Sequence, residues 1–364
     1  MELIRTFHPI GQGAFYSERH YIRGTEFTIV YDCGSTTLQG KKFERKIKST
    51  FPKDHSIDVL FISHFHADHI NGIEILAKHC NIKKVVLPLI DNTAKTLLKV
   101  ANLIENNFLD TRLIDDPDEF FGKDIPIIRI ETNNFDQESV EINTNISINI
   151  SEVKNSENFP SGTVFKSFLN NDWLFIPFNY EHQVREKQFE KAIKNEGLSL
   201  VEIDSINKII KNKSIIIKAY KDVDGDLNKN SMILFSGKKM SDRIHCFDHN
   251  THFYFIRHLD FQSGCLYLGD IDLNEPNIVK DINSKLKQFL PFIGTLQVPH
   301  HGSIHNFVGS ILQKDVCAVI SFGTTNTYGH PSDRVLGEII ANQLYPRMVT
   351  ENQKSIVIQW KPSS

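Results

Sequence analysis

The sequence lacks any apolar run long enough to cross a membrane, and it lacks a marked excess of one charge. No uninterrupted apolar stretch reaches the ~18 residues of a membrane-spanning helix, and residues 1–5 have none of the apolar character of a secretory signal. The 41 lysines and arginines are balanced by 44 aspartates and glutamates, for a formal net charge of -3. This balance excludes a global positive field for nucleic acid and leaves only local basic patches. We therefore expect a cytoplasmic protein with no membrane partner.

Cysteine is also scarce, with five residues in a chain of 364. None of them has the CxxC spacing of a zinc ribbon or a redox motif, which argues against a disulfide framework and for reduced thiols. Hydrophobic residues make up 40% of the chain and charged residues 23%, which is ordinary for a globular protein. The length allows one large domain or two smaller ones. We predict a single domain over residues 1–364, with an inserted and mainly helical segment at about 181–213.

The most informative stretch is residues 64–69, which read His-Phe-His-Ala-Asp-His. Side chains two positions apart on an extended backbone point to the same side, so His64 and His66 can converge on one ion. Asp68 and His69 follow where an apolar strand pattern gives way to a helical one, and they can reach a second ion. Imidazole nitrogens and carboxylate oxygens are ligands that transition metals prefer. A chance cluster is a weak alternative, because only 16 of the 364 residues are histidine.

Three later apolar segments also end in side chains that can bind metal or move protons. Asp270 follows the strand pattern at 265–268, the pair His300 and His301 follows the pattern at 295–298, and His330 follows the pattern at 318–322. A single ending of this kind is unremarkable. Three in succession, after the histidine-rich stretch, predict one shared site.

The pattern His64-x-His66-x-Asp68-His69-x-x-Gly72 resembles the signature of the metallo-β-lactamase fold superfamily. The resemblance implies an α/β fold, the four-layer αβ/βα sandwich, here with a helical insertion. Later segments read Asn-Ser, Leu-Gly-Asp, Val-Pro-His-His-Gly-Ser and Asn-x-Tyr-Gly-His-Pro. Together with a Gly-Gln-Gly turn at 11–13, they resemble the soluble domain of ComEC-type DNA-uptake proteins and their free-standing relatives. This likeness covers roughly residues 3–90 and 228–360, with Ala14 where the family tends to carry an acidic residue.

The resemblance implies a role for each candidate residue. It assigns one metal ion to His64 and His66, a second to Asp68 and His69, and a bridging position to Asp270. His301 would complete the second ion's ligands, while His300 is the alternative ligand or else a contact for substrate or for a ligand. Asp32 would orient a ligand histidine, and His182 is a candidate for a further ligand of the first ion.

The cofactors expected from this assignment are two divalent ions, with zinc as the first choice and manganese as the second. Such a pair lowers the pKa of a water molecule and stabilises growing negative charge. Asp68 or the bridging Asp270 would hold the proton of that water, and His330 would contact the scissile group or protonate the leaving group.

The remaining segments predict strands and helices around this site. Strands are expected within 3–34, 83–88, 125–130, 145–150, 163–178 and 230–235, and helices at 41–48, 93–107 and from 181 onward. Ile146, Ile148 and Ile150 alternate with polar residues, as in a half-buried strand. The helix at 41–48 is basic, which fits a solvated face or a contact with phosphate.

We predict a phosphodiesterase or nuclease acting on nucleic acid or nucleotides, because of the ComEC likeness and the lysines at 41–48 and at 208, 211, 213, 218 and 221. One alternative is a hydrolase of a choline phosphodiester or lactone, which an aromatic box of Trp173, Tyr180 and Tyr328 would favour. Another is a non-catalytic partner protein of a defence or toxin system. The inserted helices could also form a homodimer face.

Overall fold

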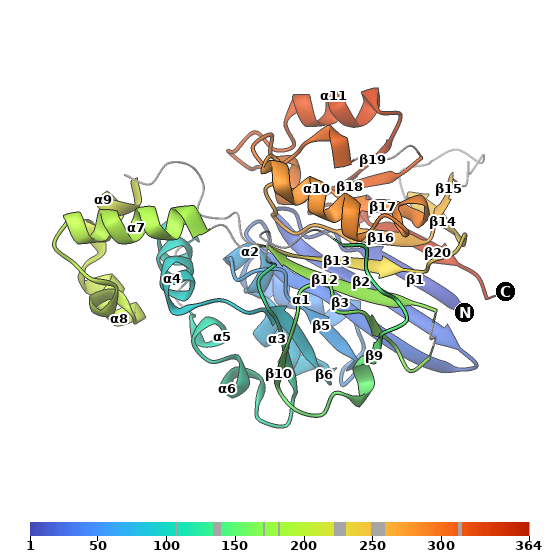
Figure 1. The fold of residues 1–364 in the computed structure, drawn as a ribbon, viewed down its shortest axis with the longest axis horizontal. Helices are drawn as coiled ribbons and strands as arrows, with labels where there is room; N and C mark the ends of the chain where they lie inside the picture. The colour runs from blue at the N-terminus through green and yellow to red at the C-terminus, as the bar shows by residue number, and fades with distance from the viewer. Residues whose placement is uncertain are drawn as a thin grey trace.

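Two large β-sheets packed face to face form the body of the protein (Figure 1). The structure, a computed structural model, describes residues 1–106, 108, 110–133, 140–169, 172–180, 183–221, 231–248, 259–311 and 315–363. The predicted mixed α/β class is confirmed, with sheets in the middle and helices on their outer faces. None of the helices in these ranges is both long and apolar enough to span a membrane.

The first sheet has ten strands in the order β10-β8-β7-β5-β3-β2-β1-β20-β14-β15. Their bounds are β1 Glu2–Phe7, β2 Gly13–Ile22, β3 Thr25–Ser35, β5 Val59–Phe61, β7 Val85–Pro88, β8 Ile127–Ile130, β10 Glu157–Phe159, β14 Arg243–Asp248, β15 Leu259–Gln262 and β20 Val357–Lys361. Strands β3, β5, β7, β8 and β10 run parallel, whereas β1 pairs antiparallel with both β2 and β20. The short parallel strands are buried on both faces, which explains their nearly continuous apolar sequences.

The second sheet has eight strands in the order β19-β18-β17-β16-β13-β12-β11-β9. Their bounds are β9 Ile148–Asn149, β11 Phe165–Lys166, β12 Leu174–Tyr180, β13 Ser231–Gly237, β16 Gly264–Tyr267, β17 Ile293–Gln297, β18 Cys317–Ser321 and β19 Tyr345–Val349. Strands β16 to β19 are parallel, so their carboxyl ends share one edge. A separate two-stranded sheet pairs β4 Ser56–Ile57 with β6 Asn81–Ile82.

The helices lie on the outer faces of both sheets and in an arm that projects from them (Figure 1). They are α1 Gly40–Thr50, α2 Ala67–Ile70, α3 Ile73–His79, α4 Asn92–Asn106, α5 Arg112–Asp115, α6 Pro117–Phe121, α7 Gln183–Asn195, α8 Ile206–Lys211, α9 Lys213–Lys221, α10 Pro276–Lys285 and α11 Asp333–Ala341. Short 3-10 helices are η1 Ile150–Glu152, η2 Leu200–Ile203, η3 Leu290–Phe292, η4 Pro299–Gly302, η5 Gly309–Ile311 and η6 Gln353–Ser355.

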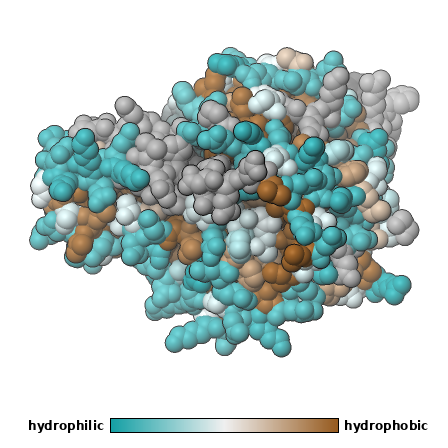
Figure 2. Space-filling model, viewed as in Figure 1, coloured by the Kyte–Doolittle hydropathy of each residue, from teal (hydrophilic) through white to brown (hydrophobic). Residues whose placement is uncertain are grey.

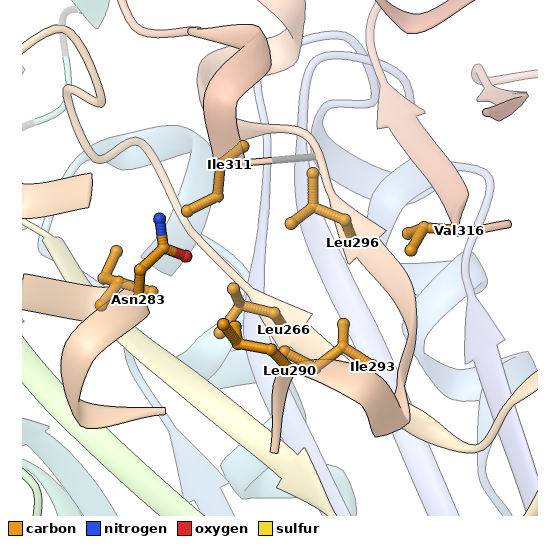
Figure 3. Close-up of a pocket in the computed structure, with 8 residues that line it drawn as sticks. Leu266, Asn283, Leu290, Ile293, Leu296, Ile311 and Val316 are labelled. Atoms are coloured by element: carbon orange, nitrogen blue, oxygen red, sulfur yellow. The ribbon is translucent and has the colours of Figure 1, made fainter. Parts of the chain in front are cut away.

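Three apolar clusters hold these layers together. One lies between the sheets and includes Phe7, Tyr31, Phe61, Phe175 and Tyr267. A second packs α1 and α3 against the first sheet, and a third packs α10 and α11 against the second. This order of layers is the predicted sandwich. A small cavity of about 10 Å³ lies in the third cluster, where side chains from β16, β17, α10 and η3 point into it (Figure 3). A cavity of this volume is too small for a substrate, so it is no candidate for the substrate site.

Helices α4, α7, α8 and α9 form an arm that projects from the sheets at the left of Figure 1. The arm has a small apolar core of its own, which includes Leu97, Val100, Phe189, Ile193 and Ile216. Its surface is largely hydrophilic in the view of Figure 2. Helix α4 joins the arm to the body, because Leu98 packs instead on the cluster beneath the first sheet.

The strand predicted over residues 145–150 is much shorter in the structure. A half-buried strand was predicted over 145–150, but only Ile148 and Asn149 form one, and a 3-10 helix begins at Ile150. Ile146 is 72% exposed. Among the described residues no strand pairs with it, so its apolar side chain is not buried although the sequence alternates.

Candidate metal centre

The candidate centre is built by loops that follow strands β5, β16 and β17. His64 and His66 lie between the end of β5 and the start of α2, which carries Asp68 and His69. Helix α2 lies very close to β3: a side-chain carbon at Gly34 would come within 2.4 Å of the backbone of Asp68 and His69. Only glycine allows this approach, which explains the Asp-x-Gly ending of β3.

Four side chains converge at this centre. Ligand atoms of Asp68, His69, Asp270 and His301 all lie within 4.8 Å of one another. The Nε2 atom of His301 is 3.0 Å from Oδ2 of Asp68, and Nε2 of His69 is 3.2 Å from Oδ1 of Asp270. These are the residues that the family resemblance assigns to the second ion and its bridge.

The two histidines assigned to the first ion lie beside this group but outside it. The Nε2 atom of His64 is 3.7 Å from Oδ2 of Asp270. The ring centroids of His64 and His66 are 5.1 Å apart, and both side chains are buried. His182, the further ligand candidate, lies outside the described residues.

Hydrogen bonds fix which ring nitrogen of three histidines carries the proton. The Nδ1–H of His69 donates to Oδ2 of Asp32 at 2.8 Å, and the Nδ1–H of His301 donates to the carbonyl oxygen of Ser321 at 2.9 Å. The hydroxyl of Ser63 donates its only proton to Asp32, so it accepts from Nδ1–H of His64 at 2.9 Å. In each ring the lone pair is therefore on Nε2, the nitrogen that faces Asp68 or Asp270 and can bind a metal.

Burial of atoms without partners indicates what the centre is built to hold. Among the described residues, Nε2 of His64, Nε2 of His69 and both carboxylate oxygens of Asp270 are buried without a hydrogen bond of normal geometry. Buried polar atoms without partners cost free energy unless a ligand satisfies them. Divalent cations would satisfy these four atoms, so the donor set fits metal binding.

The electrostatics of the protein alone show the same need for positive charge. Burial disfavours the charged form of His69, but Asp270, Asp68 and Asp32 outweigh it and hold the pKa of His69 well above its usual value. Burial and the neighbouring His69 lower the pKa of His64. Burial opposes ionisation of Asp68 and Asp270 as well, yet the histidines lower the pKa of both carboxyl groups. In the protein alone the carboxylates thus favour a positive charge on His69, and a divalent cation bound here would supply that charge in place of the proton.

The mouth of the centre is formed by the loop after β18. The ring of His330 lies 5.7 Å from that of His300, and Tyr328 stacks on His330 with centroids 5.9 Å apart. The side-chain oxygen of Asn326 accepts from the backbone N–H of His330 at 3.0 Å, which closes the turn. His330 is half-buried, so it can meet a substrate that approaches the ligands.

The predicted aromatic box is not found among the residues named for it. The Trp173 side chain is fully buried and its indole N–H donates to the hydroxyl of Ser236 at 3.0 Å. Tyr180 is buried as well, and its hydroxyl donates to Asp281 at 2.8 Å. Only Tyr328 of the three is exposed, at 67%. The expectation fails because Tyr180 ends, and Trp173 directly precedes, a strand that is covered on both faces.

Sequence reasoning missed Asn102 of α4, which holds the backbone on both sides of His66. Its side-chain oxygen accepts from the N–H of Ala67 at 2.8 Å, and its amide group donates to the carbonyl of Phe65 at 2.7 Å. Asn102 is fully buried. The signal available in the sequence was an asparagine within an otherwise apolar helical face, which is unfavourable unless the side chain has partners.

Comparisons with known proteins support the superfamily. The family model described as Metallo-beta-lactamase superfamily matches residues 20–139, which include the histidine-rich stretch. No curated protein matches the chain. The finer likeness to ComEC-type proteins has no support from these comparisons.

Solved structures with a similar arrangement share little sequence with the chain. The metallo-beta-lactamase fold protein YhfI from Bacillus subtilis is 8% identical with a TM-score of 0.40, and the alignment covers 99% of this chain and 100% of that one. A long form RNase Z from yeast is 13% identical with a TM-score of 0.37, over 88% of this chain and 37% of that one. Zn(2+)-bound PqqB from Methylobacterium extorquens is 7% identical with a TM-score of 0.40, over 96% and 98%. At this level of likeness they carry no argument about activity.

Proposed function

We propose that the protein is a metal-dependent hydrolase, and that its substrate is a phosphodiester of nucleic acid or of a nucleotide. The observation that carries the metal-dependent part is the convergence of Asp68, His69, Asp270 and His301 within 4.8 Å. The buried donor atoms without hydrogen bonds and the Nε2 lone pairs support the same conclusion. We propose His64 and His66 as ligands of a first ion, with Asp270 shared between the two ions.

When bound, a pair of divalent ions supplies an activated water and stabilises the negative charge that develops on the scissile group. The protein's own residues position the ligands and handle protons. Asp32 accepts from His69 and from Ser63, and so holds two ligand histidines in their metal-binding tautomers. The Asp68 side chain is 13% exposed, so it can also take the proton of the attacking water.

His330 is proposed as the proton donor to the leaving group. It lies at the mouth of the centre, beside His300 and stacked on the exposed Tyr328. An imidazole is a common general acid in enzymes, and at this position it could protonate a departing alkoxide. The ring is half-buried, so one part of it faces solvent, from which a substrate would approach.

A phosphodiester is favoured over other esters by the basic helix next to the centre. Helix α1 carries four lysines and one arginine against the single acidic residue Glu44. It packs on the metal motif, because the ring of Phe43 lies where a side chain at Gly72 would be. A surface hollow of about 480 Å³ lies between α1 and Asn71, and Gln39 and Lys41 line it. Exposed cations beside the catalytic centre would attract a phosphate backbone.

The ComEC likeness of the C-terminal segments supports the same substrate class. The helices of residues 181–213, which we propose to be an insertion into a single domain, add further surface lysines such as Lys211 and Lys213. Trp173 and Tyr180 are buried, so the three aromatic residues named for a choline substrate do not form a box. The convergence of Asp68, His69, Asp270 and His301 also argues against a protein that has lost catalysis.

The test is hydrolysis by the purified protein loaded with zinc or manganese. Single-stranded DNA, RNA, cyclic nucleotides and bis-p-nitrophenyl phosphate form the panel. We expect cleavage of at least one of them, loss of the activity with a chelator and recovery on adding the metal back. If all four remain intact, the proposal is wrong.

A further inference from the structure

The two sets of proposed ligands are unequal. The second ion has four protein donors, from Asp68, His69, Asp270 and His301. The first has His64, His66 and the shared Asp270. One more imidazole near the first ion would make the two sets equal. His300 lies in the right place, with its Nε2 atom 3.9 Å from Oδ2 of Asp270.

The two oxygens of Asp270 divide the centre into two sides. Oδ1 faces the second ion's ligands, since Nε2 of His69 is 3.2 Å away. Oδ2 faces two other imidazoles: Nε2 of His64 at 3.7 Å and Nε2 of His300 at 3.9 Å. His300 is therefore on the same side of the bridging carboxylate as His64, and opposite to His301, whose Nε2 contacts Asp68.

A hydrogen-bond network fixes the tautomer of His300. The carbonyl of Asp270 can only accept, so the group of Asn306 that contacts it at 2.9 Å is the amide N–H. The oxygen of Asn306 then faces Nδ1 of His300 at 2.7 Å and accepts its proton. This places the lone pair of His300 on Nε2, as in His64, His69 and His301.

The backbone at this point adopts an unusual conformation. His300 and His301 both lie in the left-handed region, with φ of 46° and 56°. Each such residue costs on the order of 1 kcal/mol and persists only where its surroundings hold it. The N–H of His300 donates to the carbonyl of Gly269 at 3.1 Å, next to Asp270. As a result, the two adjacent imidazole rings point in different directions from one short turn. Their planes are inclined at 67°, and their centroids lie 5.9 Å apart.

We infer that His300 is a ligand of the first metal ion, and completes with His64, His66 and Asp270 a four-donor set to match that of the second ion. The adjacent histidines thus divide between the two ions, one to each. This inference rests on the proposed two-metal centre. It replaces the expectation that His300 is an alternative ligand of the second ion, or else a contact for substrate or for a ligand.

The experiment measures metal content rather than turnover. Wild-type protein and the variants His300→Ala and His300→Gln are loaded with Zn²⁺ or Co²⁺, dialysed and analysed for bound metal by mass spectrometry. His305→Ala is the matched control, because His305 is an exposed histidine in the same loop. Thermal unfolding of the metal-free forms shows whether each variant folds.

We expect two ions per chain in the wild type and in the control, and one in both His300 variants. The Co²⁺ absorption of the lost site would disappear, and the dissociation constant of the weaker ion would rise at least tenfold. If folded His300 variants keep two ions with unchanged affinity and spectrum, the inference is wrong, whether or not their KM for substrate has changed.

The same data separate this inference from the proposed function. A wild type that binds two ions and loses one in the His300 variants, yet cleaves no phosphodiester, keeps the ligand assignment and removes the substrate class. A wild type that cleaves phosphodiesters, with two ions retained in the variants, keeps the function and removes the ligand assignment.

Discussion

The Nε2 atom of His301 lies 3.0 Å from Oδ2 of Asp68, although 233 positions separate the two residues in the chain. The first follows a strand of the second sheet and the second opens a helix after a strand of the first sheet. The contact therefore exists only when both sheets are formed and packed. The candidate centre therefore takes side chains from both sheets of the sandwich. Metal that binds there should stabilise the folded protein as a whole.

Asp32 should matter for metal affinity although it is not itself a proposed ligand. The Asp32 carboxylate accepts hydrogen bonds from Ser63 and His69, and Asp32→Asn replaces one of its oxygens by an amide group. The orientation of both proposed ligand histidines should therefore be less well fixed. We expect roughly a 10- to 100-fold loss of zinc affinity or of hydrolysis. Competition with a chromophoric chelator measures the affinity. An unchanged affinity in a folded variant would show that Asp32 only completes the turn.

Asn102 should link the helical arm to the centre. Asn102→Ala removes both hydrogen bonds that bracket His66 and leaves the buried N–H of Ala67 and carbonyl of Phe65 without this partner. We expect the free energy of unfolding to fall by about 1–3 kcal/mol and metal binding to weaken. Asn92→Ala, at an exposed position in the same helix, is the control. Equal behaviour of the two variants in denaturant and chelator titrations would contradict this role.

The basic helix α1 should strengthen the binding of long nucleic-acid substrates and have little effect on small ones. Replacing Lys41 and Lys42 by glutamate reverses the charge beside the hollow, so KM for single-stranded DNA should rise at least tenfold and its dependence on salt should weaken. Hydrolysis of bis-p-nitrophenyl phosphate should change less than twofold. The control replaces the exposed Lys83 and Lys123 by glutamate, with the same change in net charge. If both double variants lose DNA cleavage equally, the effect belongs to overall charge and not to α1.

Stability should decline in acid through two buried groups away from the metal ligands. Burial lowers the pKa of His8 to about 3, so this imidazole stays neutral in the folded protein while the unfolded chain takes up a proton near pH 6.5. Burial alone would raise the pKa of Glu18, but Arg5 and His20 outweigh it and lower the value to about 2. In both cases the unfolded chain binds more protons at intermediate pH. The stabilisation is therefore complete above the unfolded pKa and is lost as pH falls toward the folded pKa.

For His8 this window runs from about pH 6.5 down to about pH 3, and for Glu18 from about 4.5 down to about 2. Each group contributes a slope of about 1.4 kcal/mol per pH unit within its window. Denaturant unfolding of the metal-free protein measures this slope. His8→Gln should flatten the curve between pH 6 and 5, where Glu18 does not yet titrate in either state. A variant with the wild-type slope there would rule out His8 as the source.

The sequence was most informative where buried strands end in ligand-type side chains. Asp68, Asp270 and His301 were predicted to share one site, and the structure brings them together. The prediction was possible because the carboxyl ends of neighbouring strands share an edge and metals select few residue types. The layered fold followed from the same strands and from the family signature. The roles of Asn102 and Asn306 could not be predicted, because both side chains reach the centre through tertiary contacts. An asparagine in an apolar helical face indicates that Asn102 needs partners, but not which partners.

Backbone conformation was the other limit. Nothing in the letters Pro-His-His-Gly predicts two left-handed histidines, because that conformation is imposed by contacts with Gly269 and the loop around it. Pairing of β1 with β20, which joins the two ends of the chain, is likewise a consequence of packing. The alternation at Ile146 to Ile150 predicted a strand that lacks a partner to bury it.

The most direct test of the central claim is the metal content and hydrolytic rate of Asp270→Asn beside the wild type. The account predicts two divalent ions per wild-type chain, and in the variant a loss of bound metal together with a fall in phosphodiester hydrolysis on the order of 10³-fold or more. A wild type that binds no stoichiometric metal, or a metal-depleted variant that hydrolyses at the wild-type rate, would contradict it.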